Sequence, residues 1–178
     1  MRKYLLLLLP LTISSLAIYG VAVWKGMGSF LFAWILNFML MMCLLSLTQT
    51  LKPKLTSNYY ATQRWENGGR IYRYFGVNLF RRILVWIGWE KLNKKTNPVE
   101  KSLDSLSALE YGTRQSEFGH LVIFMIVLVL TVFVALKFGL SKAWWLLGLN
   151  LILNFYPIIL QRYNRPRLKR AVLLGYQR

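Results

Sequence analysis

The chain alternates between long apolar runs and stretches rich in polar and charged residues. A helix that crosses the hydrocarbon core of a bilayer needs roughly 20 apolar residues. Runs of about that length cover residues 4–23, 30–47, 118–136 and 143–160. The pattern therefore predicts an all-α integral membrane protein with four transmembrane helices.

Short loops connect these runs in pairs. Residues 24–29 join the first two runs and residues 137–142 join the last two, which leaves room only for tight connections. We therefore expect two helical hairpins within a single membrane domain, residues 1–178. The first run follows two basic residues, as a signal peptide does, but it is long for a signal sequence and lacks a convincing cleavage site. We expect it to be retained.

The long polar segment between the hairpins, residues 48–117, is predicted to hold helices of its own. From Ile71 to Trp89 it interleaves aromatic and aliphatic residues with arginines, which is typical of an amphipathic helix at a membrane surface. A second helix is expected to start near Ser102 or Asp104 and to run through Gly112 into the third span. The last segment, residues 161–178, is a basic tail.

Charge refines this picture. Hydrophobic residues make up 56% of the 178 residues, which does not suit a soluble domain, and the net charge is +17. In a soluble protein such an excess would point first to nucleic acid. In a membrane protein it is accounted for by segments that face anionic lipid heads, so we expect membrane lipid as a partner and no nucleic acid.

The basic residues also predict an orientation. Twenty of the 23 lie in the N-terminus, the central segment or the tail. The positive-inside rule therefore places both termini and residues 48–117 on the cytoplasmic side of the cell (inner) membrane. All six acidic residues also lie in the central segment, so polar chemistry is expected at that face.

A first group of candidate residues lies where the third span begins. Arg114, Glu117 and His120 are spaced so that they lie on one side of a helix. The carboxylate could fix the tautomer of the only histidine and raise its basicity, as a general base requires, and Arg114 could hold an anion nearby. An interfacial salt-bridge ladder is an equally good explanation. A metal site is disfavoured because Glu and His supply only two ligands.

A second group directly follows the fourth span, in the sequence QRYNRPRL from Gln161 to Leu168. Arginine side chains bind phosphate or carboxylate through two parallel hydrogen bonds. Pro166 disfavours helix at Arg165, so the chain is expected to turn here. The alternative is a stop-transfer cluster that contacts lipid phosphates.

Polar residues also occur inside the apolar runs. Asn150 and Asn154 lie one helical turn apart, and Asn37 lies near the middle of the second run. For Asn37 we favour a hydrogen bond between helices. Asn154, followed by Pro157, could instead line a kinked cavity that contacts substrate. Outside the runs, Glu66 offers a further acid beside a glycine turn.

These residues carry a family resemblance. The block QRYNRPRL, together with Thr113-Arg114-xx-Glu117-xx-His120 and Trp65-Glu66-xx-Gly69, resembles the glycosyl-4,4'-diaponeurosporenoate acyltransferase family of staphyloxanthin-type carotenoid biosynthesis. The resemblance covers roughly residues 64–168. Family members are small membrane proteins that esterify the sugar hydroxyl of a glycosylated carotenoid acid with a fatty acyl group. This chain carries an additional hairpin in its first 50 residues.

The resemblance implies roles for individual residues. His120 becomes the candidate base and Glu117 the residue that orients it. A cradle for the phosphates of an acyl donor would consist of Arg114, Arg162, Arg165 and Arg167. Further candidates for substrate contact are Glu66 and Asn164. We expect the imidazole and its neighbouring carboxylate to converge with the arginine-rich tail in one polar pocket at the inner leaflet.

The sequence thus predicts a membrane O-acyltransferase that acts on a glycosylated carotenoid or a similar glycolipid. Its co-substrate would be an acyl thioester, as acyl-CoA or acyl carrier protein, without a bound cofactor. The alternative is a non-catalytic membrane subunit whose basic cytoplasmic face binds a membrane protein partner or anionic lipid. Substitution of His120 separates the two, because only the enzyme requires it.

Overall fold

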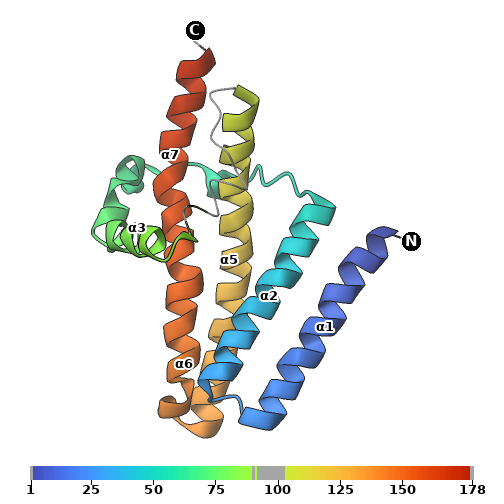
Figure 1. Ribbon diagram of the computed structural model, residues 1–178. Helices are drawn as coiled ribbons and strands as arrows, with labels where there is room; N and C mark the ends of the chain where they lie inside the picture. Colours follow the sequence, from blue (N-terminus) through green and yellow to red (C-terminus); the bar gives the residue numbers. More distant parts are fainter. Residues whose placement is uncertain (1, 90, 92–102, 177–178) are drawn as a thin grey trace. The chain divides into compact units, whose positions relative to one another are not determined.

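The computed structural model describes residues 2–89, 91 and 103–176, and every regular element in these ranges is a helix (Figure 1). The α-helices are α1 (Arg2–Lys25), α2 (Phe30–Leu51), α3 (Val77–Trp86), α5 (Leu103–Phe138), α6 (Leu140–Asn150) and α7 (Tyr156–Tyr176). Two 3₁₀ segments, η1 (Asn58–Tyr60) and η2 (Arg64–Arg73), precede α3, and a π-helical segment, η3 (Leu151–Phe155), joins α6 to α7.

Among the described residues, four helical stretches are long and apolar enough to cross a membrane, which confirms the predicted fold class. They cover Leu7–Lys25, Phe30–Leu51, Asp104–Phe138 and Leu140–Leu174. The last of them combines α6, η3 and α7. The protein is therefore an all-α membrane protein with four candidate membrane-spanning helical stretches.

The chain divides into two compact units. The first contains residues 1–54 and 118–155, and the second contains residues 55–117 and 156–178. Residues of α5 contribute to both units, because the helix is continuous from Leu103 to Phe138. This continuity confirms the expectation that a helix starting near Ser102 or Asp104 runs through Gly112 into the third span, although Ser102 itself lies outside the described residues.

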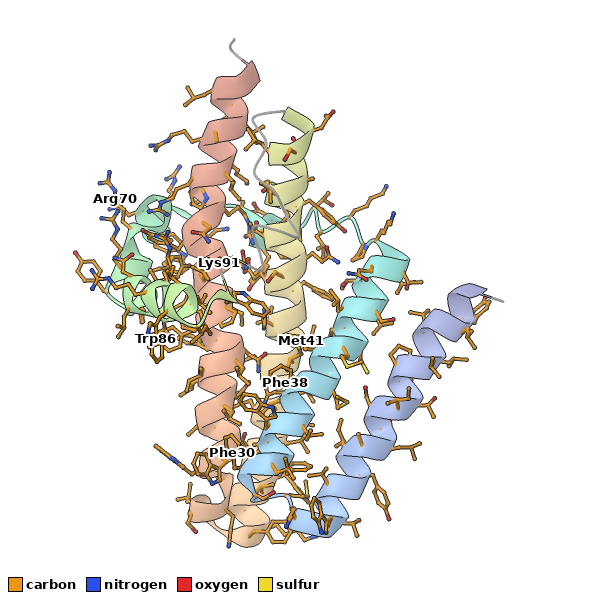
Figure 2. The ribbon with its side chains drawn as sticks, in the orientation of Figure 1. Phe30, Phe38, Met41, Arg70, Trp86 and Lys91 are labelled. Atoms are coloured by element: carbon orange, nitrogen blue, oxygen red, sulfur yellow. The ribbon has the colours of Figure 1, made fainter. Side chains whose placement is uncertain are left out.

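The first unit is built from two hairpins. Helices α1 and α2 pack against each other and are joined by a tight turn. At the start of α2 the Ser29 hydroxyl accepts a hydrogen bond from the Phe32 N–H at 3.2 Å. Figure 2 marks Phe30, Phe38 and Met41 along α2. The core joins α2, α5 and α6, and consists of Phe32, Ala33, Leu36, Ile123, Val127, Val134, Ala143, Leu146 and Leu149. The apolar residues of α1 are largely exposed, as a lipid-facing helix requires.

The second unit brings the central segment onto α7. Helix α3 buries Val77 and stacks the Phe80 ring on that of Tyr156, with centroids 5.1 Å apart. The predicted amphipathic helix is therefore present, but it is shorter than the range Ile71–Trp89. It begins only after Gly76, whose backbone is left-handed (φ 75°), and the residues before it form η2.

The predicted turn at Arg165 is wrong, because α7 continues as a helix through Pro166. Proline removes one backbone hydrogen bond, which here would reach the Arg162 carbonyl, and such a loss is tolerated when tertiary contacts hold the helix. Arg165 is buried and is bonded to residues of α5. These contacts hold α7 in shape across the proline.

Candidate functional site

The centre of the second unit is a buried carboxylate, Glu117 of α5, whose exposed fraction is 0%. Its Oε1 accepts a hydrogen bond from Arg162 Nε at 2.8 Å, and its Oε2 pairs with the Arg165 guanidinium. Both arginines lie on α7, one helical turn apart. A carboxylate taken out of water must be paired and hydrogen-bonded, and Glu117 meets both requirements.

Glu66 of η2 completes the ion-pair network from the other side of Arg162. Its Oε1 lies 2.5 Å from Arg162 Nη1 and also accepts from the Tyr72 hydroxyl at 2.5 Å. Its Oε2 accepts from the Gln63 backbone N–H at 2.6 Å. Burial alone would raise the pKa of the Glu66 carboxyl, but hydrogen bonds from Tyr72 and Arg162 outweigh it and lower that pKa from its ordinary value. We call Glu66, Glu117, Arg162 and Arg165 the arginine–glutamate network.

Two adjacent tyrosines cover this network. Arg162 Nη2 donates to the Tyr59 carbonyl at 2.8 Å, and its guanidinium lies 4.5 Å from the centre of the Tyr59 ring. Arg165 donates to the Tyr60 carbonyl at 3.2 Å and to the Thr113 hydroxyl at 3.0 Å. Burial raises the pKa of both phenols, so they stay neutral near pH 7. The donors of the two arginines are thus largely used within the protein.

Gly69 lets η2 approach α7 closely. Its backbone is left-handed (φ 84°), and a Cβ at this position would lie 3.2 Å from the Tyr163 carbonyl oxygen and 3.3 Å from that of Arg162. A side chain there would meet helix backbone, which cannot yield cheaply. The turn that places Glu66 beside Arg162 therefore depends on this glycine.

A separate polar group lies in the first unit. His120 Nδ1 is 3.2 Å from Asn154 Oδ1, and the Asn154 amide nitrogen donates to Asn37 Oδ1 at 2.6 Å and to Asn150 Oδ1 at 2.9 Å. The outer asparagines are oriented in turn by backbone carbonyls: Asn37 donates to Ala33 and Asn150 donates to Phe124. We call these four residues the histidine–asparagine chain.

The direction of this chain fixes the histidine tautomer. Because Asn37 and Asn150 use their NH₂ groups on carbonyls, they present oxygens to Asn154, which must then donate. Asn154 consequently offers only its oxygen to the imidazole. His120 Nδ1 carries the hydrogen, and the lone pair of the neutral ring lies on Nε2.

The predicted site residues therefore fall into different partnerships. Glu117 binds Arg162 and Arg165 of the tail, and His120 meets Asn154 in place of the expected Glu117. The single polar pocket expected for the imidazole, the carboxylate and the tail stays a prediction. Arg114 forms an ion pair with Glu110 at 2.8 Å and donates to the Leu55 carbonyl. The interhelical hydrogen bond expected of Asn37 is confirmed.

The other two site candidates of the sequence QRYNRPRL, Asn164 and Arg167, also lie on α7. Asn164 is partly buried, and the exposed Arg167 stacks on the Tyr163 ring, with 3.6 Å between the guanidinium carbon and the ring centre.

Sequence reasoning missed the residues that complete these groups. Tyr72 acts through its hydroxyl, whereas Tyr59 and Tyr60 act through backbone carbonyls, which no residue pattern distinguishes. The pairing of Asn37 with Asn154 was also not foreseen, although both residues drew attention as amides within apolar runs. An unpartnered amide in hydrocarbon is the signal that could have linked them.

Comparison with protein families assigns the chain to a family. A model described as glycosyl-4,4'-diaponeurosporenoate acyltransferase matches residues 56–173, about two thirds of the chain. The chain belongs to this family. The matched range contains the whole arginine–glutamate network, together with His120, Asn150 and Asn154 of the histidine–asparagine chain. The match does not extend to α1 and α2, so Asn37 lies outside the matched range. No curated protein and no solved structure matches the chain.

Proposed function

We propose that the protein is a membrane O-acyltransferase that moves a fatty acyl group from a thioester donor to a sugar hydroxyl of a glycosylated carotenoid or a similar glycolipid. Family membership supports the reaction class and the acceptor class. The observation that carries the catalytic assignment is the histidine–asparagine chain, because it orients the imidazole so that Nε2 is the basic nitrogen of its neutral form.

In this proposal His120 Nε2 is the general base. It removes the proton of the sugar hydroxyl as the hydroxyl oxygen attacks the thioester carbonyl carbon. The C–O bond forms, the C–S bond breaks, and the imidazolium returns the proton to the leaving thiolate. Asn154 holds the ring through Nδ1 and is a positioning residue, supported by Asn37 and Asn150.

The arginine–glutamate network serves as a frame in this proposal. Arg162 and Arg165 are held by two carboxylates and two carbonyls, so their geometry is set by the protein itself. We assign them to holding α5, α7 and η2 together, and we assign phosphate binding to arginines that lack a carboxylate. The distribution of basic residues supports an inner-membrane location with both termini and residues 48–117 in the cytoplasm.

The test is acyl transfer in membranes that contain the protein, with labelled acyl-CoA and a glycosylated carotenoid as substrates. The variant His120→Asn keeps a donor toward Asn154 but lacks the atom equivalent to Nε2. We expect transfer to fall by about 100-fold or more at unchanged protein level. The variant Asn154→Leu should lower turnover less, with little change in KM, because it loosens the ring without removing the base.

The outcome separates this function from the non-catalytic alternative. A membrane subunit would tolerate His120→Asn with no change in any acylated lipid. Full transfer activity in that variant would remove the base assignment, whereas absence of transfer by the unaltered protein with every donor and acceptor would overturn the enzymatic proposal.

A further inference from the structure

Three arginines of the second unit interact with the buried Tyr163 side chain, and a fourth, Arg170, follows Arg167 on α7 and interacts with it. They come from three different elements: one from η2, one from α3 and two from α7. All four are exposed, whereas the Tyr163 side chain is buried. We call this group the arginine cluster; it consists of Arg73, Arg81, Arg167 and Arg170.

The contacts of the ring hold the cluster together. The Arg167 guanidinium carbon lies 3.6 Å from the ring centre on one side, and that of Arg81 lies 5.8 Å away. Arg73 interacts electrostatically with the Tyr163 hydroxyl. Arg167 interacts repulsively with the like charges of the other three arginines. The sequence therefore brings four positive charges to one aromatic platform.

The carboxylates described in this unit do not neutralise the cluster. Glu66 and Glu117 pair with Arg162 and Arg165, Glu110 pairs with Arg114 and lies 4.0 Å from Lys169, and the described ion pairs include none between Asp104 and an arginine of the cluster. Within residues 2–89, 91 and 103–176, no ion pair involves an arginine of the cluster. Converging guanidinium groups that lack a counter-charge favour an anion able to accept from several of them at once.

We propose that the arginine cluster is a binding site for a phosphate group, with Tyr163 as its platform. A phosphate presents several oxygens in a tetrahedral arrangement, so donors from η2, α3 and α7 can each reach one. The Tyr163 hydroxyl can accept from Arg73 and still donate its own hydrogen to the ligand. The cluster differs from the arginines that bind Glu66 and Glu117, and it shares only Arg167 with the cradle predicted from the sequence.

The phosphate could belong to a soluble molecule, such as the nucleotide part of a coenzyme A thioester, or to a lipid headgroup. Figure 2 shows Arg70 on η2 and Trp86 on α3 within this unit. Helix α3, which supplies Arg81, also exposes Leu79, Ile83 and Trp86. The shared chemistry is recognition of phosphate, and the two sources are separated by experiment.

The test compares two double variants that remove the same charge from the same elements. The cluster variant is Arg73→Gln with Arg81→Gln, and the control variant is Arg64→Gln with Arg82→Gln, which changes exposed arginines outside the cluster. In one arm, calorimetry measures coenzyme A binding to protein in phosphatidylcholine nanodiscs. In the other, mass spectrometry measures the phosphatidylglycerol retained by protein purified from mixed nanodiscs.

We expect the cluster variant to lose about tenfold or more of its coenzyme A affinity or of its retained phosphatidylglycerol. The control variant should change by less than about twofold in either measurement. Loss of coenzyme A binding identifies a soluble donor, and loss of retained phosphatidylglycerol identifies a lipid headgroup. Equal behaviour of both variants in both arms would overturn the proposal. If the cluster variant melts at a lower temperature than the control, the single variant Arg170→Gln is compared with the single control variant Arg82→Gln, which removes the same charge from an exposed arginine outside the cluster.

Failure of this site is distinguishable from failure of the proposed acyl transfer. Both arms measure binding without turnover, so His120→Asn should bind both probes as the unaltered protein does. Loss of binding in the cluster variant concerns the phosphate site and says nothing about catalysis. Loss of transfer in His120→Asn with unchanged binding concerns catalysis and says nothing about the phosphate site.

Discussion

At the scale of single residues, the second unit depends on a few buried charges that satisfy one another. Arg162 bridges Glu66 and Glu117, so one guanidinium links η2 to α5 from its position on α7. Removing one partner of a buried ion pair leaves an uncompensated charge and typically costs about 3–5 kcal/mol. Because the backbone turn at η2 places Glu66 beside Arg162, a change in this turn would separate the ion pair as well.

Gly69 provides a direct test of this backbone conformation. Gly69→Ala should destabilise the protein by roughly 2 kcal/mol or more, because it combines left-handed strain with contact against α7 backbone. Gly68→Ala is the matched control, since Gly68 is also left-handed (φ 61°) but nothing lies within 4 Å of a Cβ there. Thermal unfolding in detergent should show the larger loss for Gly69→Ala, and equal losses would contradict the close approach.

The ionisation of Glu66 predicts how stability depends on pH. Its pKa is lowered in the folded protein, so the unfolded chain binds a proton at a higher pH than the folded one. The stabilisation is complete above the ordinary carboxyl pKa of about 4.3 and is lost as pH falls through the lower, folded pKa. Melting temperatures below about pH 5 should therefore fall more steeply for the unaltered protein than for Glu66→Gln. Parallel profiles would show that Glu66 does not act in this way.

At the scale of elements, α3 has two apolar sides with different neighbours. Val77 and Phe80 pack inward, whereas Leu79, Ile83 and Trp86 are exposed, Trp86 to 87%. Asn78 and Arg81 lie on the remaining, polar arc of the helix. This arrangement suits a helix that lies at a membrane surface with its exposed apolar side in lipid.

A nitroxide probe can test the position of α3. With Cys43→Ala as background, a label at Trp86→Cys is expected to be more accessible to oxygen than to a water-soluble nickel reagent, because oxygen partitions into lipid. A label at Asn78→Cys should show the reverse order. Equal accessibility of both labels to the nickel reagent would place the whole helix in water.

The elements also show what sequence could and could not predict. The spans follow from hydropathy, and α5 follows from its apolar pattern together with its starting residues. The path of α7 through Pro166 could not be predicted, because it depends on contacts of Arg165 with Thr113 and Glu117, about 50 positions earlier in the chain. The residue before a proline disfavours helix, and these tertiary contacts outweigh that local preference.

The sequence predicted which residues belong to the candidate site better than it predicted which of them contact one another. Glu117, His120, Arg162 and Arg165 attract attention by residue type and spacing. Spacing on one helix suggested Glu117 as the partner of His120, but the structure gives Glu117 two arginines and gives His120 an asparagine. Which partner a side chain meets depends on how separate helices pack, and that information is not local.

At the scale of the whole molecule, the chain combines the range matched by its family with a hairpin, α1 and α2, that lies outside this range. The first unit includes α1 and α2, and Asn37 of α2 supplies an acceptor for Asn154. This contact extends the support of His120 beyond residues 56–173. The hairpin therefore contributes to the proposed base in addition to anchoring the chain.

The central claim is that His120 Nε2 transfers a proton while an acyl group moves onto a glycolipid. Lipid mass spectrometry of cells that produce the glycosylated acceptor tests it most directly, comparing the unaltered protein with His120→Asn at equal protein level. The unaltered protein should convert the glycolipid to a species heavier by one fatty acyl group, and His120→Asn should leave it unconverted. An acylated product in both strains, or in neither, would contradict the account.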